Sequence, residues 1–364
     1  ESPSMRLAPF ASLVVASAAL RSLPGEHGSA ALLQASAASP LHRLAYPAQA
    51  VEGILLSSAR RESLEWAAGG GVEEAGEDAV HVCVVAQGKI VTQELAELVR
   101  SVLYHRGALT PVFHVITDDW TSSRVREVFR NATWDRVHLV SFHAANVSKQ
   151  LDELGVHWEA PGVAFFTKAF LWQFLPSVER CILLDTDMLL AAPLAELQGV
   201  FGTFGERHVM AAIWRGNARA GNKLNGGVVL HDFGKQRASG WPSAVRASHR
   251  MMVMAGSRQL ADGRLDLVFP DQEILHGALM AYSNETDPSS MPGGLLALDT
   301  RWNNELIQKL HGLCSTPPRI APGILHFNGG DATAIWMCRS NLEPYLPCLQ
   351  HLVEEHALPA WPPC

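Results

Sequence analysis

The chain has 364 residues, 48% of them hydrophobic and 18% charged, and its formal net charge is −7. This length suits one large domain or two small ones, with enough apolar residues for a sizeable core. The negative balance argues against a nucleic-acid binder, because no basic surplus is available to neutralise phosphates. Any bound phosphate is therefore expected to be held locally, by a metal ion or by backbone groups.

The N-terminal part reads as a leader followed by a linker. Residues 7–20 are uncharged and lie between Arg6 and Arg21. They are short for a membrane span, which needs roughly 20 residues, and they predict a signal peptide or short signal anchor at 1–24. Residues 25–79 are rich in Ala, Ser, Gly and Glu and predict a low-complexity stem. The alternative is a disordered tail on a cytosolic protein.

Two further features bear on the compartment. N-glycosylation sequons begin at Asn131, Asn146 and Asn284. No cysteine forms a CxxC pair, so a structural zinc site is not expected. Cys83 and Cys181 lie in apolar runs and predict buried free thiols. The other cysteines cluster near the C-terminus, where an oxidising compartment would favour one or two disulfides: Cys314, Cys338, Cys348 and Cys364. With the leader, these features favour the secretory pathway.

From His81 onward, short apolar runs alternate with helical patterns. Strands are predicted at 81–86, 111–116, 136–142 and 180–185. Apolar residues at helical spacing between 95 and 103 predict an amphipathic helix, and residues 164–175 predict a second helix that Pro176 ends. This alternation predicts an α/β fold, with a mostly parallel central sheet and helices on both faces. Ligands of such sheets bind beyond the carboxyl ends of the strands.

An Asp-Thr-Asp triplet follows the fourth strand. Side chains alternate along a strand, so Asp185 and Asp187 are expected on one face and Thr186 on the other. Two carboxylates at a strand end suit a hard divalent cation, Mg²⁺ or Mn²⁺. One alternative is that Asp187 caps a helix, which Pro193 would weaken. The other is a haloacid-dehalogenase-like phosphatase, whose motif has Thr or Val where this chain has Leu189.

Four downstream segments carry further candidate residues. Asn225 and two glycines are predicted to precede a strand and to allow close backbone approach to a ligand. Asp271 and Gln272 are predicted at the start of a helix, where Asp271 is alternatively an N-cap. Residues 301–303 form a compact Arg-Trp-Asn, and His326 ends an apolar strand before a glycine pair. Taken singly, the segments also fit a tight turn, a helix cap and a structural histidine.

Taken in order, these segments resemble the family 8 glycosyltransferases, the retaining group with the GT-A fold. Residues 81–119 and 165–197 look most similar to the LARGE-type and the glucoside and xyloside xylosyltransferases. The resemblance covers residues 80–340. It implies a GT-A catalytic domain at 80–350, followed by a C-terminal tail at 351–364.

The resemblance also implies residue roles. Asp185, Asp187 and His326 would hold Mn²⁺, which bridges the diphosphate of a UDP-sugar; the imidazole suits Mn²⁺ better than Mg²⁺, the alternative ion. Asp271, Gln272 and Asn225 match the catalytic positions beside the transferred sugar. The implied donor-binding set is Ala86, Lys168, Asp185, Thr186, Asp187 and Gly329.

One element departs from the family pattern. Many members follow the histidine with a Lys-Pro-Trp element whose lysine holds the leaving phosphate. Here Ala332 stands at the place of that lysine, Trp336 comes later, and Arg339 is a candidate replacement. A sugar-binding protein of the same fold without turnover is therefore a second hypothesis.

The remaining expectations concern the reaction and its place. The favoured donor is UDP-xylose, with UDP-glucose or UDP-galactose as alternatives, and the acceptor is expected to be a glycan or glycoprotein. Configuration is retained, either by front-face attack or through a short-lived adduct with a carboxylate such as Asp271. The expected location is the Golgi or endoplasmic-reticulum lumen, as a type II membrane or secreted protein.

Overall fold

The computed structural model describes residues 76, 78–87, 89–141, 144–158, 166–216, 223–305 and 322–326. All belong to the second of two units into which the chain divides, Ser63–Cys364. The predicted leader, most of the stem, the four C-terminal cysteines, and the segment with Gly329, Ala332, Trp336 and Arg339 lie outside the described residues. In the described part of the chain, no helix is both long and apolar enough to cross a membrane.

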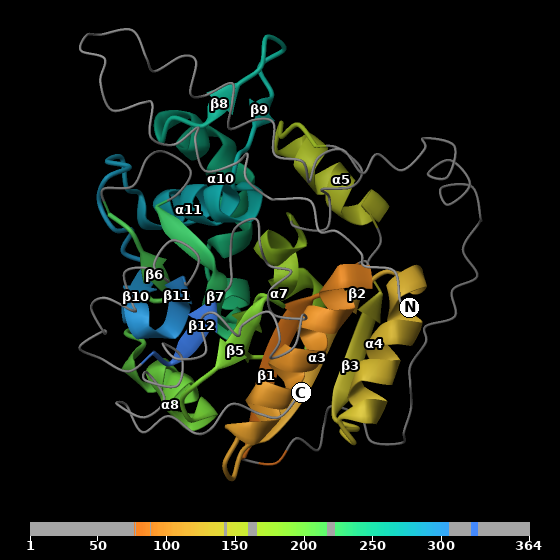
Figure 1. The fold of residues 1–364 in the computed structure, drawn as a ribbon. Coiled ribbons are helices and arrows are strands. Elements are labelled where there is room, and N and C mark those ends of the chain that lie inside the picture. The colour runs from red at the N-terminus through yellow and green to blue at the C-terminus, as the bar shows by residue number, and fades with distance from the viewer. Residues whose placement is uncertain are drawn as a thin grey trace, which may run out of the picture. The chain divides into compact units, whose positions relative to one another are not determined.

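A seven-stranded sheet forms the centre of the fold, in the order β10-β6-β7-β4-β1-β2-β3 (Figure 1). Neighbouring strands are parallel except for β7, which runs antiparallel to both β4 and β6. The prediction of a mostly parallel sheet is therefore confirmed. The strands are β1 (Ala79–Val85), β2 (Thr110–Thr117), β3 (Val137–Ser141), β4 (Arg180–Leu184), β6 (Met210–Trp214), β7 (Leu224–Asp232) and β10 (Leu295–Ala297).

Helices cover both faces of this sheet. Because side chains alternate along β1, Val82 and Val84 join one core, whereas Cys83 joins the other. The Val82 core includes residues of α3 (Lys89–Tyr104), α4 (Asp119–Asn131), α8 (Leu194–Gly199) and η5 (Val200–Thr203). The Cys83 core includes residues of α5 (Ala144–Glu153), α9 (Phe233–Ala238), α10 (Trp241–Met254) and α11 (Pro270–Ser283). Cys83 and Cys181 are buried and free, as predicted.

A second, three-stranded sheet brings together segments that are distant in the sequence. Its order is β11 (Asn304–Glu305), β12 (Ile324–His326) and β5 (Met188–Leu190). His326 pairs with Met188 on one side and with Glu305 on the other. The end of the Asp-Thr-Asp triplet, the histidine and the Arg-Trp-Asn segment, which forms η6 (Thr300–Asn303), therefore lie side by side. A two-stranded sheet of β8 (Arg258–Gln259) and β9 (Leu265–Asp266) completes the strands described.

The structure differs from the sequence predictions in two elements. In the described part of the helix predicted at 164–175, a 3₁₀ turn, η4 (Thr167–Phe170), is followed by the single turn α7 (Leu171–Phe174). Phe170 interrupts it because its φ of −117° and ψ of 12° are not helical. Asn225 and the two glycines lie within β7 rather than before it, where the register against β6 shifts between Ala212 and Ile213.

Candidate active site

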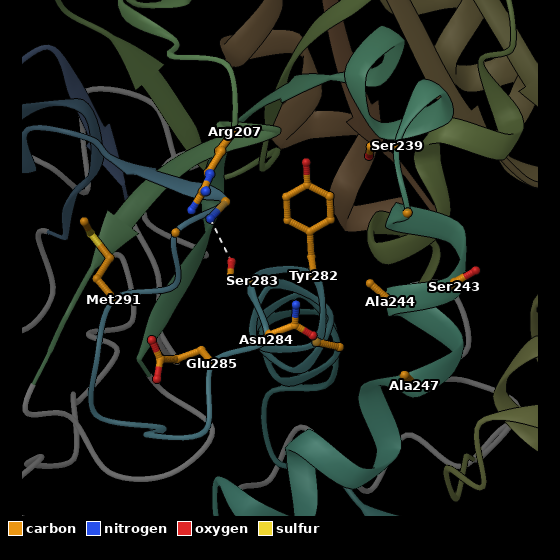
Figure 2. Close-up of a pocket in the computed structure, with 14 residues that line it drawn as sticks. Arg207, Ser239, Ser243, Ala244, Ala247, Tyr282, Ser283, Asn284, Glu285 and Met291 are labelled. Carbon is orange, nitrogen blue, oxygen red and sulfur yellow. Dashed lines mark hydrogen bonds between the residues drawn. The ribbon is translucent and has the colours of Figure 1, made fainter.

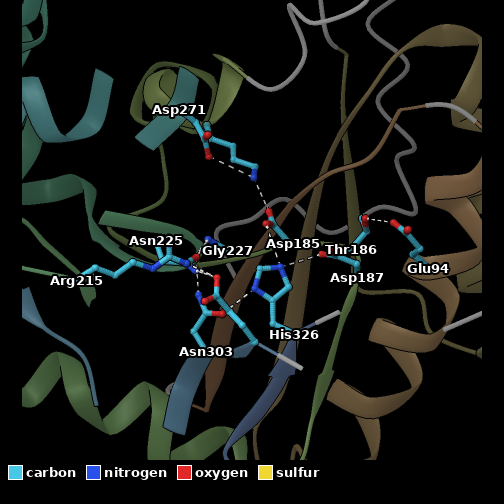
Figure 3. Close-up of polar contacts among 12 residues, drawn as sticks. Glu94, Asp185, Thr186, Asp187, Arg215, Asn225, Gly227, Asp271, Asn303 and His326 are labelled. Carbon is cyan, nitrogen blue, oxygen red and sulfur yellow. Dashed lines mark hydrogen bonds and ion pairs between the residues drawn. The ribbon is translucent and has the colours of Figure 1, made fainter. Parts of the chain in front are cut away.

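The Asp-Thr-Asp triplet forms the turn between β4 and β5. The backbone N–H of Asp185 donates to the carbonyl of Gly227 at 2.9 Å, so β7 fixes the start of the turn. The Thr186 hydroxyl donates to Glu94 Oε2 on α3 at 2.5 Å. Figure 3 shows Thr186 turned toward Glu94, away from His326. Asp187 precedes a strand, and α8 begins only at Leu194, so the helix-cap alternative is wrong.

His326 reaches the two aspartates from β12. Its Nε2 lies 3.3 Å from Asp187 Oδ1 and 3.8 Å from Asp185 Oδ2. One ligand atom from each of the three residues lies within 4.8 Å of the others, and this is the metal-capable group found among the described residues. Two carboxylates and one imidazole suit a divalent ion such as Mn²⁺ and leave positions open for a substrate. The predicted convergence of the three side chains is confirmed.

Lys168 connects this group to α11. Its Nζ lies 2.5 Å from Asp185 Oδ1 and 3.4 Å from Asp271 Oδ2. Burial acts to lower the pKa of Lys168, but the charges of Asp185 and Asp271 outweigh it and hold the pKa above its ordinary value. The lysine is therefore a permanent buried cation between two carboxylates.

The start of α11 places the next two predicted residues. Asp271 is buried in the first turn, but the N-cap is Phe269, so Asp271 is not the capping residue. Its carboxylate forms an ion pair with Lys168 through Oδ2. The Oε1 atom of Gln272 is buried and has no hydrogen-bond partner among the described residues. A buried acceptor of this kind suits a ligand hydroxyl. Ala86, also predicted, is buried just beyond β1, and its N–H donates to the Ile116 carbonyl at 2.9 Å.

The two glycines of β7 allow the catalytic-site side chains to approach the sheet. A Cβ atom at Gly226 would lie 2.6 Å from Asp271 Oδ2. A Cβ atom at Gly227 would lie 2.6 Å from both His326 Cε1 and Met188 Cε. These separations are far below van der Waals contact. Glycine is therefore required because the protein's own side chains pack there, which the sequence pattern did not reveal.

A row of polar side chains lies behind His326. Its Nδ1 is 2.7 Å from Asn303 Oδ1, and Asn303 Nδ2 donates to Asn225 Oδ1 at 2.6 Å. Asn225 Nδ2 donates to Glu305, which forms an ion pair with Arg215. Both ends of the side-chain amide of Asn225, a predicted catalytic residue, are therefore hydrogen-bonded to other protein side chains. In the sequence, Asn303 stands out only as part of the Arg-Trp-Asn segment, and no motif marks Glu305, Arg215 or Glu94.

A separate hollow of about 780 Å³ lies at the far end of α11 (Figure 2). Tyr282, Arg207 and Asn284 are among the residues that line it. Asn284 is the exposed left-handed C-cap of α11 and the first residue of a sequon. None of the lining residues belongs to the group around Asp185, so the chemistry is assigned to that group.

Comparisons with known proteins show which sequences and folds this chain is similar to. No protein-family profile matches the chain. The xylosyl- and glucuronyltransferase LARGE2s of Gallus gallus is 28% identical over 201 residues, which cover 50% of this chain and 27% of that protein. The xylosyl- and glucuronyltransferase LARGE1 of Homo sapiens is 26% identical over 219 residues, which cover 56% of this chain and 27% of that protein. The chain thus matches about a quarter of the length of these relatives.

Two solved structures share the fold. Mouse xyloside xylosyltransferase 1 matches with a TM-score of 0.52 at 15% identity, over 69% of this chain and 98% of that one. The galactosyltransferase LgtC, in complex with donor and acceptor sugar analogues, matches with a TM-score of 0.50 at 14% identity, over 74% and 95%. The fold is therefore GT-A. In sequence, the chain is distantly similar to the LARGE enzymes.

The close packing at Gly227 leads to a first prediction. We expect Gly227→Ala to weaken Mn²⁺ binding, because the new methyl group displaces the His326 ring. Gly202→Ala is the matched control, since a Cβ atom there meets nothing within 4 Å. Isothermal titration with Mn²⁺ alone compares the two variants. Equal affinities would contradict the role of Gly227.

Proposed function

We propose that the chain is a metal-dependent retaining glycosyltransferase that moves a sugar from a UDP-sugar to a glycan or glycoprotein. The observation that carries this proposal is the convergence of Asp185, Asp187 and His326 beside the buried cation Lys168. The two aspartates come from the turn between β4 and β5, and the histidine comes from β12, which is distant in the sequence. Their position beyond the carboxyl end of β4 is where ligands bind in such folds.

The chain's residues divide the work by position. Asp185, Asp187 and His326 would hold Mn²⁺, with Mg²⁺ as the alternative ion. When bound, this ion supplies positive charge that stabilises the departing diphosphate. Lys168 supplies a second, permanent positive charge next to Asp185. Ala86, Thr186 and Gly329 complete the proposed donor site; Thr186 contributes by anchoring the acidic turn to Glu94.

The sugar side of the site is proposed at the start of α11. Asp271 and Gln272 present a carboxylate and a buried amide oxygen, both suited to sugar hydroxyls or to an electron-poor anomeric carbon. Retention of configuration follows either from front-face attack or from a short-lived adduct with Asp271. Asn225 is proposed to act at this site through the residues it supports, because both ends of its amide contact the protein.

The acceptor and location follow from weaker but independent features. Asn131 and Asn284 begin sequons, and both side chains are exposed, as an acceptor for N-glycosylation must be. With the apolar leader, they support a Golgi or endoplasmic-reticulum lumenal enzyme, type II or secreted. A lumenal enzyme meets glycans on secreted proteins, so a glycan or glycoprotein is the proposed acceptor.

A second prediction tests the metal and nucleotide together. We expect Asp187→Asn to abolish Mn²⁺-dependent UDP binding, because it removes one anionic ligand without changing the side-chain volume. The loss should exceed the roughly 10–100-fold effect typical of an outer-shell partner. Asp262→Asn is the control, since Asp262 is exposed and its hydrogen bonds to described residues go to nearby Arg264. Calorimetric titration with UDP, with and without Mn²⁺, gives the result. If the wild-type protein binds UDP with the same affinity in the presence and absence of Mn²⁺, the proposal is refuted.

A third prediction concerns the donor. We expect UDP release to be fastest with UDP-xylose, because the sequence is most similar to xylosyltransferases and a matched relative is named a xylosyl- and glucuronyltransferase. A panel of UDP-xylose, UDP-glucuronic acid, UDP-glucose and UDP-galactose, read by UDP release, measures this preference. Preference for a hexose would show that the assignment to xylose is wrong. Metal-dependent binding without release from any donor would favour the alternative, a sugar-binding protein that has lost turnover.

A further inference from the structure

The polar row behind His326 has a fixed hydrogen-bond direction. It runs from His326 through Asn303 and Asn225 to Glu305 and Arg215 (Figure 3). The first three side chains are buried, with exposed fractions of 3–4%. Each amide in the row has one donating and one accepting end, so a single fixed contact determines the direction of all the others.

Two contacts fix the orientation of Asn225. The backbone N–H of Gly227 can only donate, and it meets Asn225 Oδ1 at 2.8 Å. At the other end, the Glu305 carboxylate can only accept, and it receives Asn225 Nδ2 at 2.8 Å. Glu305 also forms an ion pair with Arg215, in which the guanidinium is the donor. The carbonyl end of Asn225 therefore faces Gly227 and Asn303.

The direction then passes to the metal ligand. Because Asn225 presents an oxygen, Asn303 must donate its Nδ2 across the 2.6 Å contact. Asn303 Oδ1 is left facing His326 Nδ1 at 2.7 Å, so Nδ1 must carry a hydrogen. In the neutral imidazole the lone pair is then on Nε2, which is the atom that faces Asp185 and Asp187.

We propose that Asn303 and Asn225 are positioning residues that hold His326 in the Nδ1–H tautomer, the one that can bind a cation through Nε2. The backbone amide of Gly227 and the Glu305 carboxylate set this choice from up to three side chains away. The consequence for metal affinity rests on the metal site of the proposed function, whereas the tautomer itself does not.

Two variants of Asn303 test the proposal. Asn303→Ala removes the acceptor for Nδ1–H, and we expect Mn²⁺ affinity to fall by roughly 10–100-fold. Asn303→Asp keeps an oxygen toward His326 but loses the Nδ2 donor to Asn225 Oδ1, so it should retain the Nδ1–H tautomer while breaking the link to Asn225. Asn304→Ala is the matched control, because Asn304 is also buried but makes no contact in this row. Mn²⁺ alone is the titrant, and thermal unfolding checks that each variant folds.

A direct readout is ¹⁵N NMR of histidine-labelled, metal-free protein at pH 8.5, with His326→Gln identifying the resonance. The proposal expects a protonated Nδ1 and an unprotonated Nε2 in the wild type and in Asn303→Asp. It is overturned if wild-type His326 carries its hydrogen on Nε2, or if Asn303→Ala binds Mn²⁺ as tightly as Asn304→Ala. If Asn303→Ala does not fold, the tautomer of His326 in Asn303→Asp decides: a hydrogen on Nδ1 supports the proposal, and a hydrogen on Nε2 alone overturns it. A protein without any transferase activity would leave these readouts unchanged, so failure of the proposed function is distinguishable.

Discussion

The arrangement of this site depends on how the negative charges of three carboxylates are compensated, those of Asp185, Asp187 and Asp271. Such groups repel one another, and burial makes their charges costly. Lys168 lies between two of them, and His326 lies beside the third. A divalent ion held by Asp185, Asp187 and His326 would complete this compensation and would at the same time provide the charge needed by a diphosphate.

Gly226 and Gly227 contact side chains and backbone from several elements of the site. The Gly227 carbonyl accepts from the Asp185 amide, and its N–H donates to Asn225. The missing side chains of the pair leave room for Asp271 and His326. One dipeptide in β7 therefore positions residues that come from β4, α11 and β12. This shared dependence explains why side chains from separated motifs lie next to one another.

Much of this architecture follows from the sequence. The β-branched runs at β1 and β2 and the helical spacing of α3 are local signals of secondary structure. Asp185, Asp187 and His326 are residue types that bind metal ions, and they lie at predicted strand ends, so they favour a metal site. The interruption of the helix around Lys168 could not be predicted, because the non-helical backbone of Phe170 leaves no mark on the apolar pattern. Glu305 was missed for a different reason. Its strand, β11, has two residues and exists only through pairing with β12, and two residues show no periodicity.

The most direct measurement of the central claim is the position of the metal ion in crystals grown with Mn²⁺ and UDP, located by anomalous scattering at the manganese edge. The account predicts a peak bounded by carboxylate oxygens of Asp185 and Asp187 and by Nε2 of His326, with the diphosphate on its open side. A peak away from these three side chains, or a manganese ion coordinated without His326, would contradict it.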